Sequence, residues 1–349
     1  MILPASGPTD SPKTTSIGAR ANRWAFARTA LAVAMICCAA LLIGEMLIEW
    51  HSSARLAVDL KLTSAQRLID GETLYPTRGR AAGGYPYPPL WAFLVTPLLL
   101  LPAVAAEYCA AILCVALMLA ALWIVGTRDP VCYAIALWSV SVVALARLCN
   151  ASALVAPLIA VGYRWNSAPT GIAVALKLYA WPLLLWGGIT RGRRDLLVGI
   201  GAAAAAIFVP WAAIGFDGVT RYVSVARDIT EATQGSTYAL PLPLSITITA
   251  LALAGMWIRR RDPASSFAFG VLAMLAATPV LWDFYFSAIF VPLALQRPRA
   301  SVAWFVPLAM WWAPGALHLA SMFLLLAWLG IGAPTPSWSG HQMFRTRPR

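Results

Sequence analysis

The acidic residues that follow the first apolar run are candidates for chemistry. Residues 55–102 contain the longest polar segment between apolar blocks apart from the N-terminal tail, and hold Asp59, Asp70 and Glu72, three of only 14 acidic residues. Asp59 lies a few residues past an apolar run and beside apolar side chains, so its carboxylate would be partly desolvated. Such a group suits a general base that takes a proton from a hydroxyl. The alternative is an ordinary solvated loop acid.

Lys177 is the second candidate, because it stands in the middle of an apolar run, GIAVALKLYAWP. A lysine at the centre of a membrane helix costs roughly 3 kcal/mol on insertion scales. We therefore expect Lys177 to face the bundle interior, a water-filled cavity or an anion. The alternative is that its ammonium group snorkels to an interface about two turns away.

Further candidates combine aromatic and polar side chains near the predicted ends of apolar segments. Tyr85 and Tyr87 precede the second apolar run, where aromatic residues form an interfacial belt or stack on a sugar. The segment TPVLWDFYF adds Trp282, Asp283 and Tyr285, and Asp283 is either a site residue or a span-end acid. Asn150 and His318 are either substrate contacts or satisfied polar groups inside the bundle.

The composition places these candidates in a membrane protein. The chain has 349 residues, of which 60% are hydrophobic and 11% charged, and its mean hydropathy is +0.72. Soluble domains carry about a quarter charged residues, whereas apolar runs of about 20 residues span a bilayer. We predict an all-α polytopic protein with about 10–12 transmembrane helices. The net charge is +12, and most of the basic residues stand in short clusters between spans. This pattern indicates topology control and anionic lipid contacts rather than nucleic-acid binding.

The predicted organisation is one transmembrane domain, 23–333, between a disordered cytoplasmic tail, 1–22, and a second cytoplasmic tail, 334–349. Basic clusters such as Arg191–Arg194 mark the cytoplasmic side, which places both termini there and predicts a multi-pass protein of a bacterial inner membrane. Residues 51–87 then form an extracytoplasmic catalytic loop, and 215–240 form a second outer loop. Within the first loop, apolar residues at helical spacing predict an interfacial helix that ends at Gly71.

The first outer loop breaks the positive-inside pattern. Five basic residues occur in it: Arg55, Lys61, Arg67, Arg78 and Arg80. Binding of a phosphate on the outer face would explain this exception, since basic side chains form strong charge-assisted hydrogen bonds with phosphate. The sequence has neither metal-ligand spacing nor a Gly-rich nucleotide loop, so we expect no metal or cofactor and a donor that resides in the membrane.

Four segments together resemble a known family. An Asp-Leu pair at Asp59 follows the first span, and GETLYP precedes YPYPPLWAFLVTPLLLLP. A turn at Asn150 leads to GIAVALKLYAWPLLLW, and TPVLWDFYF lies nearer the C-terminus. Over roughly residues 28–295 the chain resembles glycosyltransferase family 87, multi-span bacterial enzymes of the GT-C superfamily that include the mannosyltransferase of phosphatidylinositol-mannoside synthesis. One departure is Phe284, where the family often has a histidine whose role would be absent or moved to His318.

The resemblance implies a GT-C fold, a polyprenyl-phosphate-linked sugar donor and inverting transfer on the outer face to a lipid or glycan acceptor. By matching position, Asp59 would be the catalytic base. Lys177, Arg55 and Arg67 would neutralise charge on the departing phosphate. We expect mannose or arabinofuranose as the sugar. The rival hypothesis is a flippase for a lipid-linked sugar, which should show internal repeats and paired broken helices.

Overall fold

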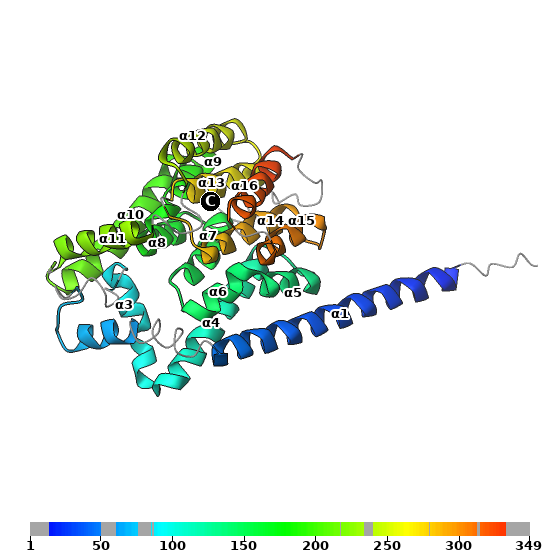
Figure 1. Ribbon diagram of the computed structural model, residues 1–349. Coiled ribbons are helices and arrows are strands. Elements are labelled where there is room, and N and C mark those ends of the chain that lie inside the picture. Colours follow the sequence, from blue (N-terminus) through cyan, green and yellow to red (C-terminus); the bar gives the residue numbers. More distant parts are fainter. Residues whose placement is uncertain are drawn as a thin grey trace, which may run out of the picture.

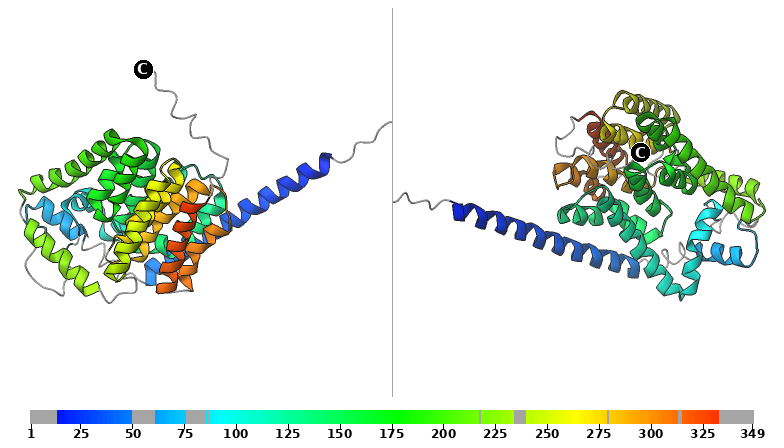
Figure 2. Two further views of the ribbon diagram at one scale, coloured as in Figure 1. Left: turned by 90° about the horizontal axis from the view of Figure 1, so that it is seen from above. Right: turned by 180° about the vertical axis from the view of Figure 1, so that it is seen from behind.

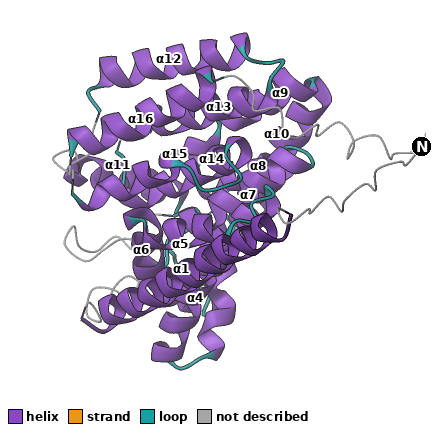
Figure 3. Ribbon diagram, turned by 90° about the vertical axis from the view of Figure 1, so that its right-hand side faces the viewer, coloured by secondary structure: helices purple, strands orange, loops and turns teal. Residues whose placement is uncertain are grey.

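The structure is a computed structural model that describes residues 14–49, 61–75, 85, 87–216, 218–233, 240–278, 280–312 and 315–332. Every regular element in these ranges is a helix (Figures 1 and 3). The prediction of an all-α protein is therefore confirmed. Asp59, Arg55 and most of the first outer loop lie outside the described residues, as do most of the two predicted tails.

The N-terminal helix α1 (Thr14–Glu49) is long and extends well beyond the rest of the bundle (Figures 1 and 2). It packs on α5 (Pro130–Trp138) and α6 (Val140–Leu148). The Trp138 indole N–H donates to the carbonyl of Met35 at 2.7 Å, which ties α1 to this pair. The predicted helix in the first outer loop is also present over residues 61–69, and Gly71 follows it with a left-handed φ of 70°.

The helices that surround the candidate site come from the middle of the chain. After α3 (Pro89–Val95) and its 3₁₀ continuation η1 (Thr96–Leu100), the long α4 (Ala103–Ile124) packs on α6 and on α7 (Ser152–Arg164). The central elements that follow α7 are α8 (Ala168–Leu176), η2 (Leu178–Ala180), α9 (Pro182–Arg191) and α10 (Arg193–Ala213).

The last third of the chain covers one side of the bundle, where α12, α13 and α16 lie side by side (Figures 1 and 3). Its elements are α11 (Val219–Thr233), α12 (Leu242–Ile258), α13 (Pro263–Ala276), η3 (Asp283–Ile289), α14 (Phe290–Gln296), α15 (Val302–Phe305), η4 (Val306–Trp311) and α16 (Ala316–Ile331). The 3₁₀ element η3 carries the buried rings of Phe284, Tyr285 and Phe286.

Two apolar runs of the sequence do not form continuous helices. Residues 131–145 are one such run, but α5 and α6 meet at an angle of 64°. Ser139 between them is extended, with φ −73° and ψ 139°, and its hydroxyl accepts from the Val142 N–H. Residues 171–189, which contain Lys177, are the second run. Here α8 ends at Leu176, Lys177 is extended (φ −148°, ψ 103°), and α9 begins at Pro182. Capping by the Ser139 hydroxyl favours the first break, and Pro182 at the start of α9 favours the second.

Long apolar helices identify the chain as a polytopic membrane protein. Within the described ranges, three helical segments are long and apolar enough to cross a bilayer: Trp24–Glu45, Ala103–Ile124 and Arg193–Ala213. The bent pair α5–α6 makes a fourth if it is one span, and seven shorter apolar helical segments accompany these. The total of 10–12 spans stays a prediction.

Candidate functional site

The side chain of Lys177 lies in the break between α8 and η2, surrounded by aromatic rings. Its ammonium nitrogen Nζ is 3.3 Å from the hydroxyl oxygen of Tyr285. The same nitrogen lies over the rings of Tyr87, Tyr285 and Phe284, at 4.8, 5.1 and 5.8 Å from their centroids. Lys177 is partly exposed, although these three rings are buried. The arrangement holds the cation by ring faces and one hydroxyl.

Asn150 fixes one of these rings. Its side-chain N–H donates to the Tyr87 hydroxyl at 2.8 Å, and its side-chain carbonyl accepts from the Ser152 N–H at 3.0 Å. The Asn150 amide therefore links the start of α7 to the Tyr87 ring beneath Lys177. We call Lys177, Tyr87, Asn150, Phe284 and Tyr285 the Lys177 cluster. All but Phe284 were predicted as site residues, and the structure brings them together.

The backbone before α3 is positioned by aromatic packing. The Tyr75 hydroxyl donates to the Tyr87 carbonyl at 2.8 Å, and the Tyr75 ring stacks on Trp211 at 5.6 Å. Tyr85 is 1% exposed, contacts the rings of Tyr75 and Tyr87, and donates to the Pro88 carbonyl. Its ring is thus occupied by packing in this structure, and stacking of Tyr85 on a sugar stays a prediction.

The other C-terminal candidates lie on or next to η3. Trp282 stacks on Phe284 with a centroid distance of 6.0 Å and is 38% exposed, so its ring borders the cluster. Asp283 is half-buried at the first position of η3. His318 is fully buried on α16, and its ring meets the edge of Phe286 at 5.1 Å. Phe286 follows Tyr285 directly, so η3 joins His318 to the cluster.

Sequence reasoning did not single out Lys61 as a site residue. This lysine begins the helix over 61–69, is only 5% exposed, and donates to the carbonyls of Leu148 and, at 2.6 Å, Cys149. Burial lowers the pKa of Lys61 to about 8. Its spacing from the buried Ser64, Ala65 and partly buried Leu68 is helical, which is the signal that places it on the inner face. Arg67 lies half-buried on the same helix.

The Lys177 cluster has the chemistry of an anion site. In the described part of the chain, no carboxylate lies within ion-pair distance of Lys177. Ring faces and a hydroxyl, which are its contacts among the described residues, do not neutralise this partly desolvated cation, so it retains attraction for a negatively charged group. Hydroxyl, amide and ammonium groups at one point also suit a polar ligand such as a sugar phosphate.

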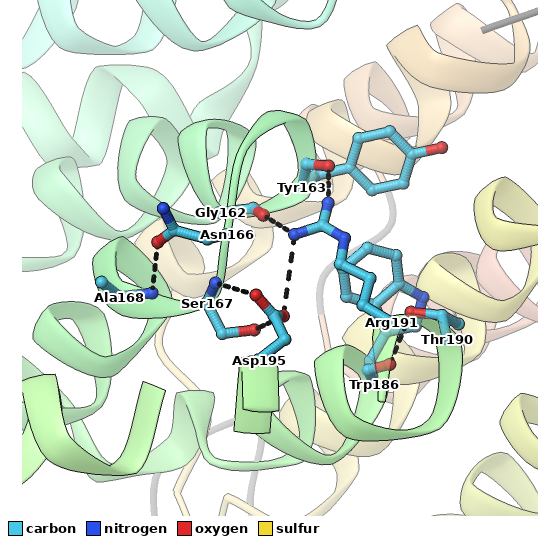
Figure 4. Close-up of polar contacts among 9 residues, drawn as sticks. All are labelled: Gly162, Tyr163, Asn166, Ser167, Ala168, Trp186, Thr190, Arg191 and Asp195. Carbon is cyan, nitrogen blue, oxygen red and sulfur yellow. Dashed lines mark hydrogen bonds and ion pairs between the residues drawn. The ribbon is translucent and has the colours of Figure 1, made fainter. Parts of the chain in front are cut away.

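A second polar cluster occupies the opposite end of α7 and α8 (Figure 4). The Arg191 guanidinium donates to the carbonyls of Gly162, at 2.8 Å, and Tyr163. Asp195 accepts from the backbone N–H of Ser167, at 3.1 Å, and from its hydroxyl, and lies 3.8 Å from Arg191. These charges serve helix ends, so we assign this cluster to structure rather than chemistry.

The model of glycosyltransferase family 87 matches residues 85–279, more than half of the chain. The matched stretch contains Tyr87, Asn150 and Lys177 and ends before Phe284. No curated protein and no solved structure matches the chain. The chain belongs to glycosyltransferase family 87 and is a membrane glycosyltransferase.

Proposed function

We propose that this enzyme transfers a sugar, mannose or arabinofuranose, from a polyprenyl-phosphate carrier to a lipid or glycan acceptor, with inversion. The observation that carries the proposal is the position of Lys177, a cation held on aromatic faces at a helix break with no carboxylate partner among the described residues. A lipid-linked sugar phosphate supplies both the anion for this lysine and the sugar for the polar groups around it.

Lys177 would act on the leaving group. Negative charge builds on the phosphate oxygen as its bond to the anomeric carbon breaks, and a fixed cation in a site of low dielectric stabilises that charge. The Tyr285 hydroxyl, 3.3 Å from Nζ, keeps the ammonium group directed into the site. Arg55 and Arg67 of the first loop would add positive charge around the same phosphate.

Asp59 would act on the nucleophile. The acceptor oxygen forms a bond to the anomeric carbon, the carbon–oxygen bond to phosphate breaks, and the phosphate leaves with the electron pair. The proton of the acceptor hydroxyl goes to the Asp59 carboxylate. Because a phosphate leaving group needs little protonation, one carboxylate suffices, unlike the carboxylate pair of glycosidases.

The proposed membrane side follows from which loops meet the cluster. The first-loop helix contacts the α6–α7 turn through Lys61, and that turn carries Asn150. Basic residues that the positive-inside rule assigns to the cytoplasm, including Arg164 and Arg191, lie at the other end of α7 and α9. We therefore place the Lys177 cluster on the extracytoplasmic face of a bacterial inner membrane, with both termini cytoplasmic.

The test is transfer by the purified protein in liposomes with radiolabelled polyprenyl-phosphate mannose or arabinofuranose and candidate acceptors. We expect wild type to form product, and Asp59→Asn and Lys177→Met to lose most of the activity. Arg193→Gln removes an exposed charge at the other end of the bundle and is the matched control. Equal activity of wild type and Asp59→Asn would remove Asp59 from the mechanism.

The same liposomes separate the enzyme from the rival flippase. Broken helices such as α8–α9 also occur in transporters, where they line binding sites. A flippase would move the labelled donor to the inner leaflet without forming product. That result would contradict the proposed transfer from this donor, whereas product without donor translocation supports it.

A further inference from the structure

Lys61 is a buried lysine whose role the family match does not address, since the match begins at residue 85. It is 5% exposed and stands at the first turn of the helix over 61–69. Lysine is almost never fully buried unless its charge is paired or hydrogen-bonded. Its ammonium group meets this requirement by donating to two successive backbone carbonyls, those of Leu148 and Cys149.

Those two carbonyls lie at the C-terminus of α6, where the helix leaves its last carbonyl groups without backbone donors. Cys149 is the C-cap and adopts a left-handed conformation, with φ 44° and ψ 49°. A residue other than glycine or asparagine is strained in this conformation. A cation that binds both carbonyls compensates the helix dipole and stabilises this turn.

The same turn places Asn150 in the Lys177 cluster. Asn150 follows Cys149 directly, and its amide donates to the Tyr87 hydroxyl at 2.8 Å. The Tyr87 ring in turn lies 4.8 Å from the Lys177 nitrogen. A chain of direct contacts therefore leads from Lys61 through the turn and Tyr87 to Lys177.

We propose that Lys61 is a positioning residue for sugar transfer: it locks the α6–α7 turn so that Asn150 holds the Tyr87 ring beneath Lys177. Docking of the first-loop helix is then what assembles the site, because Lys61 belongs to that helix and the turn belongs to the bundle. The inference rests on the proposed role of the Lys177 cluster in transfer, but its structural half can be measured without any activity.

The activity test is a double-mutant cycle in liposomes. Lys61→Met keeps the length of the side chain and removes the charge, and Asn150→Ala removes the amide. We expect Lys61→Met to lower kcat about tenfold or more, since two buried carbonyls lose a charged donor, with little change in KM for the donor. The double variant should be no more than about twofold worse than the poorer single variant, because residues in one network are not additive.

Gln66→Met is the matched control, because Gln66 is exposed on the same helix; its kcat should equal that of wild type. If Lys61→Met yields no folded protein, Lys61→Gln replaces it in the cycle, since its amide still donates to one carbonyl. An unchanged kcat, or losses that multiply in the double variant, would overturn the proposal.

Hydrogen exchange separates a failure of this inference from a failure of the proposed function. In Lys61→Met, peptides that cover Leu148–Ser152 should exchange faster than in wild type, while peptides around Ser167 at the other end of α8 should not change. That result supports the locking role whichever sugar donor the enzyme uses. Unchanged exchange at Leu148–Ser152 would overturn it even if transfer from polyprenyl-phosphate mannose is observed.

Discussion

The two ends of α7 and α8 use charged residues in different ways. We call the end that carries Arg164, Ser167 and Arg191 the capped end; the other end carries the Lys177 cluster. About 20 Å of helix separates them along the 13 residues of α7. Cations at the capped end contact helix carbonyls, as Lys61 does next to the cluster, whereas Lys177 contacts ring faces and a hydroxyl. That difference separates Lys177 from the structural cations.

At the capped end, charges complement helix termini. Arg191 donates to the last carbonyls of α7, and Arg164 donates to the Ile124 carbonyl at the end of α4, at 2.9 Å. Carboxylates cap the N-termini of helices instead. Asp129 accepts from the Val131 N–H at the start of α5, and Asp262 accepts from the Ser265 N–H at the start of α13. Positive charge at carbonyl ends and negative charge at N–H ends both stabilise the helix dipoles.

At the other end, Lys177 departs from this pattern. It is itself the C-cap of α8, so helix carbonyls are close in sequence, but its ammonium group is held by the Tyr285 hydroxyl and by ring faces. Ring faces attract a cation without neutralising it. The comparison indicates that the cations bound to helix carbonyls are structural, whereas Lys177, held on rings at a helix break, is the cation that we propose binds an anionic ligand.

Removal of the charge at Lys177 should have the largest effect on activity. We expect Lys177→Met to lower kcat about 10²–10³-fold, the loss typical for one electrostatic contact to a developing anion. The melting temperature in detergent should change little, because the lysine serves no helix end. Lys177→Arg, which retains the charge, should keep more activity than Lys177→Met. A large fall in melting temperature with unchanged kcat would reverse the assignment of the two ends.

The sequence predicted the helical membrane class, the first-loop helix and its end at Gly71, because hydropathy, periodicity and a glycine signal are local. It also singled out Tyr87, Asn150, Lys177 and Tyr285, since polar residues in apolar runs are conspicuous. The breaks at Ser139 and Lys177 were not predicted, because serine and lysine do not by themselves end an apolar helix. The role of Lys61 was also missed, since it depends on carbonyls 87 and 88 residues away.

The capped end depends on close packing of α8 against α10, which a single methyl group should disturb. A Cβ atom on Gly171 would lie 2.1 Å from the Gly199 carbonyl oxygen and 2.8 Å from the Ala203 nitrogen, both backbone atoms that cannot rotate away. We expect Gly171→Ala to destabilise the fold by about 1–3 kcal/mol through overpacking. The measurement is the melting temperature of the purified protein in detergent.

Gly201→Ala is the matched control for this packing. Gly201 lies in α10, and a Cβ atom there meets nothing within 4 Å. Its melting temperature should be unchanged or slightly raised, because alanine has the higher helix propensity. Equal loss in both variants would mean that the close approach of α8 and α10 at Gly171 is not the cause of the destabilisation.

Loss of the Asp195 carboxylate should have a smaller effect that is confined to stability. Asp195→Ala removes the acceptor of the Ser167 N–H and hydroxyl and the ion-pair partner of Arg191 (Figure 4). We expect a loss of about 1–2 kcal/mol, the range for an N-terminal capping carboxylate. The kcat of the remaining folded protein should equal that of wild type. A fall in kcat without a lower melting temperature would show that the capped end takes part in catalysis.

The smallest effect is expected at the edge of the capped end, where Arg28 of α1 pairs with Asp129. The Arg28 side chain is 50% exposed, so its ion pair should contribute less than about 1 kcal/mol. Asp129, in contrast, is 7% exposed and also accepts from the N–H groups of Val131 and Ala300 at 3.1 and 2.9 Å. Arg28→Ala should therefore leave the melting temperature nearly unchanged, whereas Asp129→Ala should lower it clearly. Equal losses would mean that the exposed pair, rather than the helix cap, stabilises this corner of the bundle.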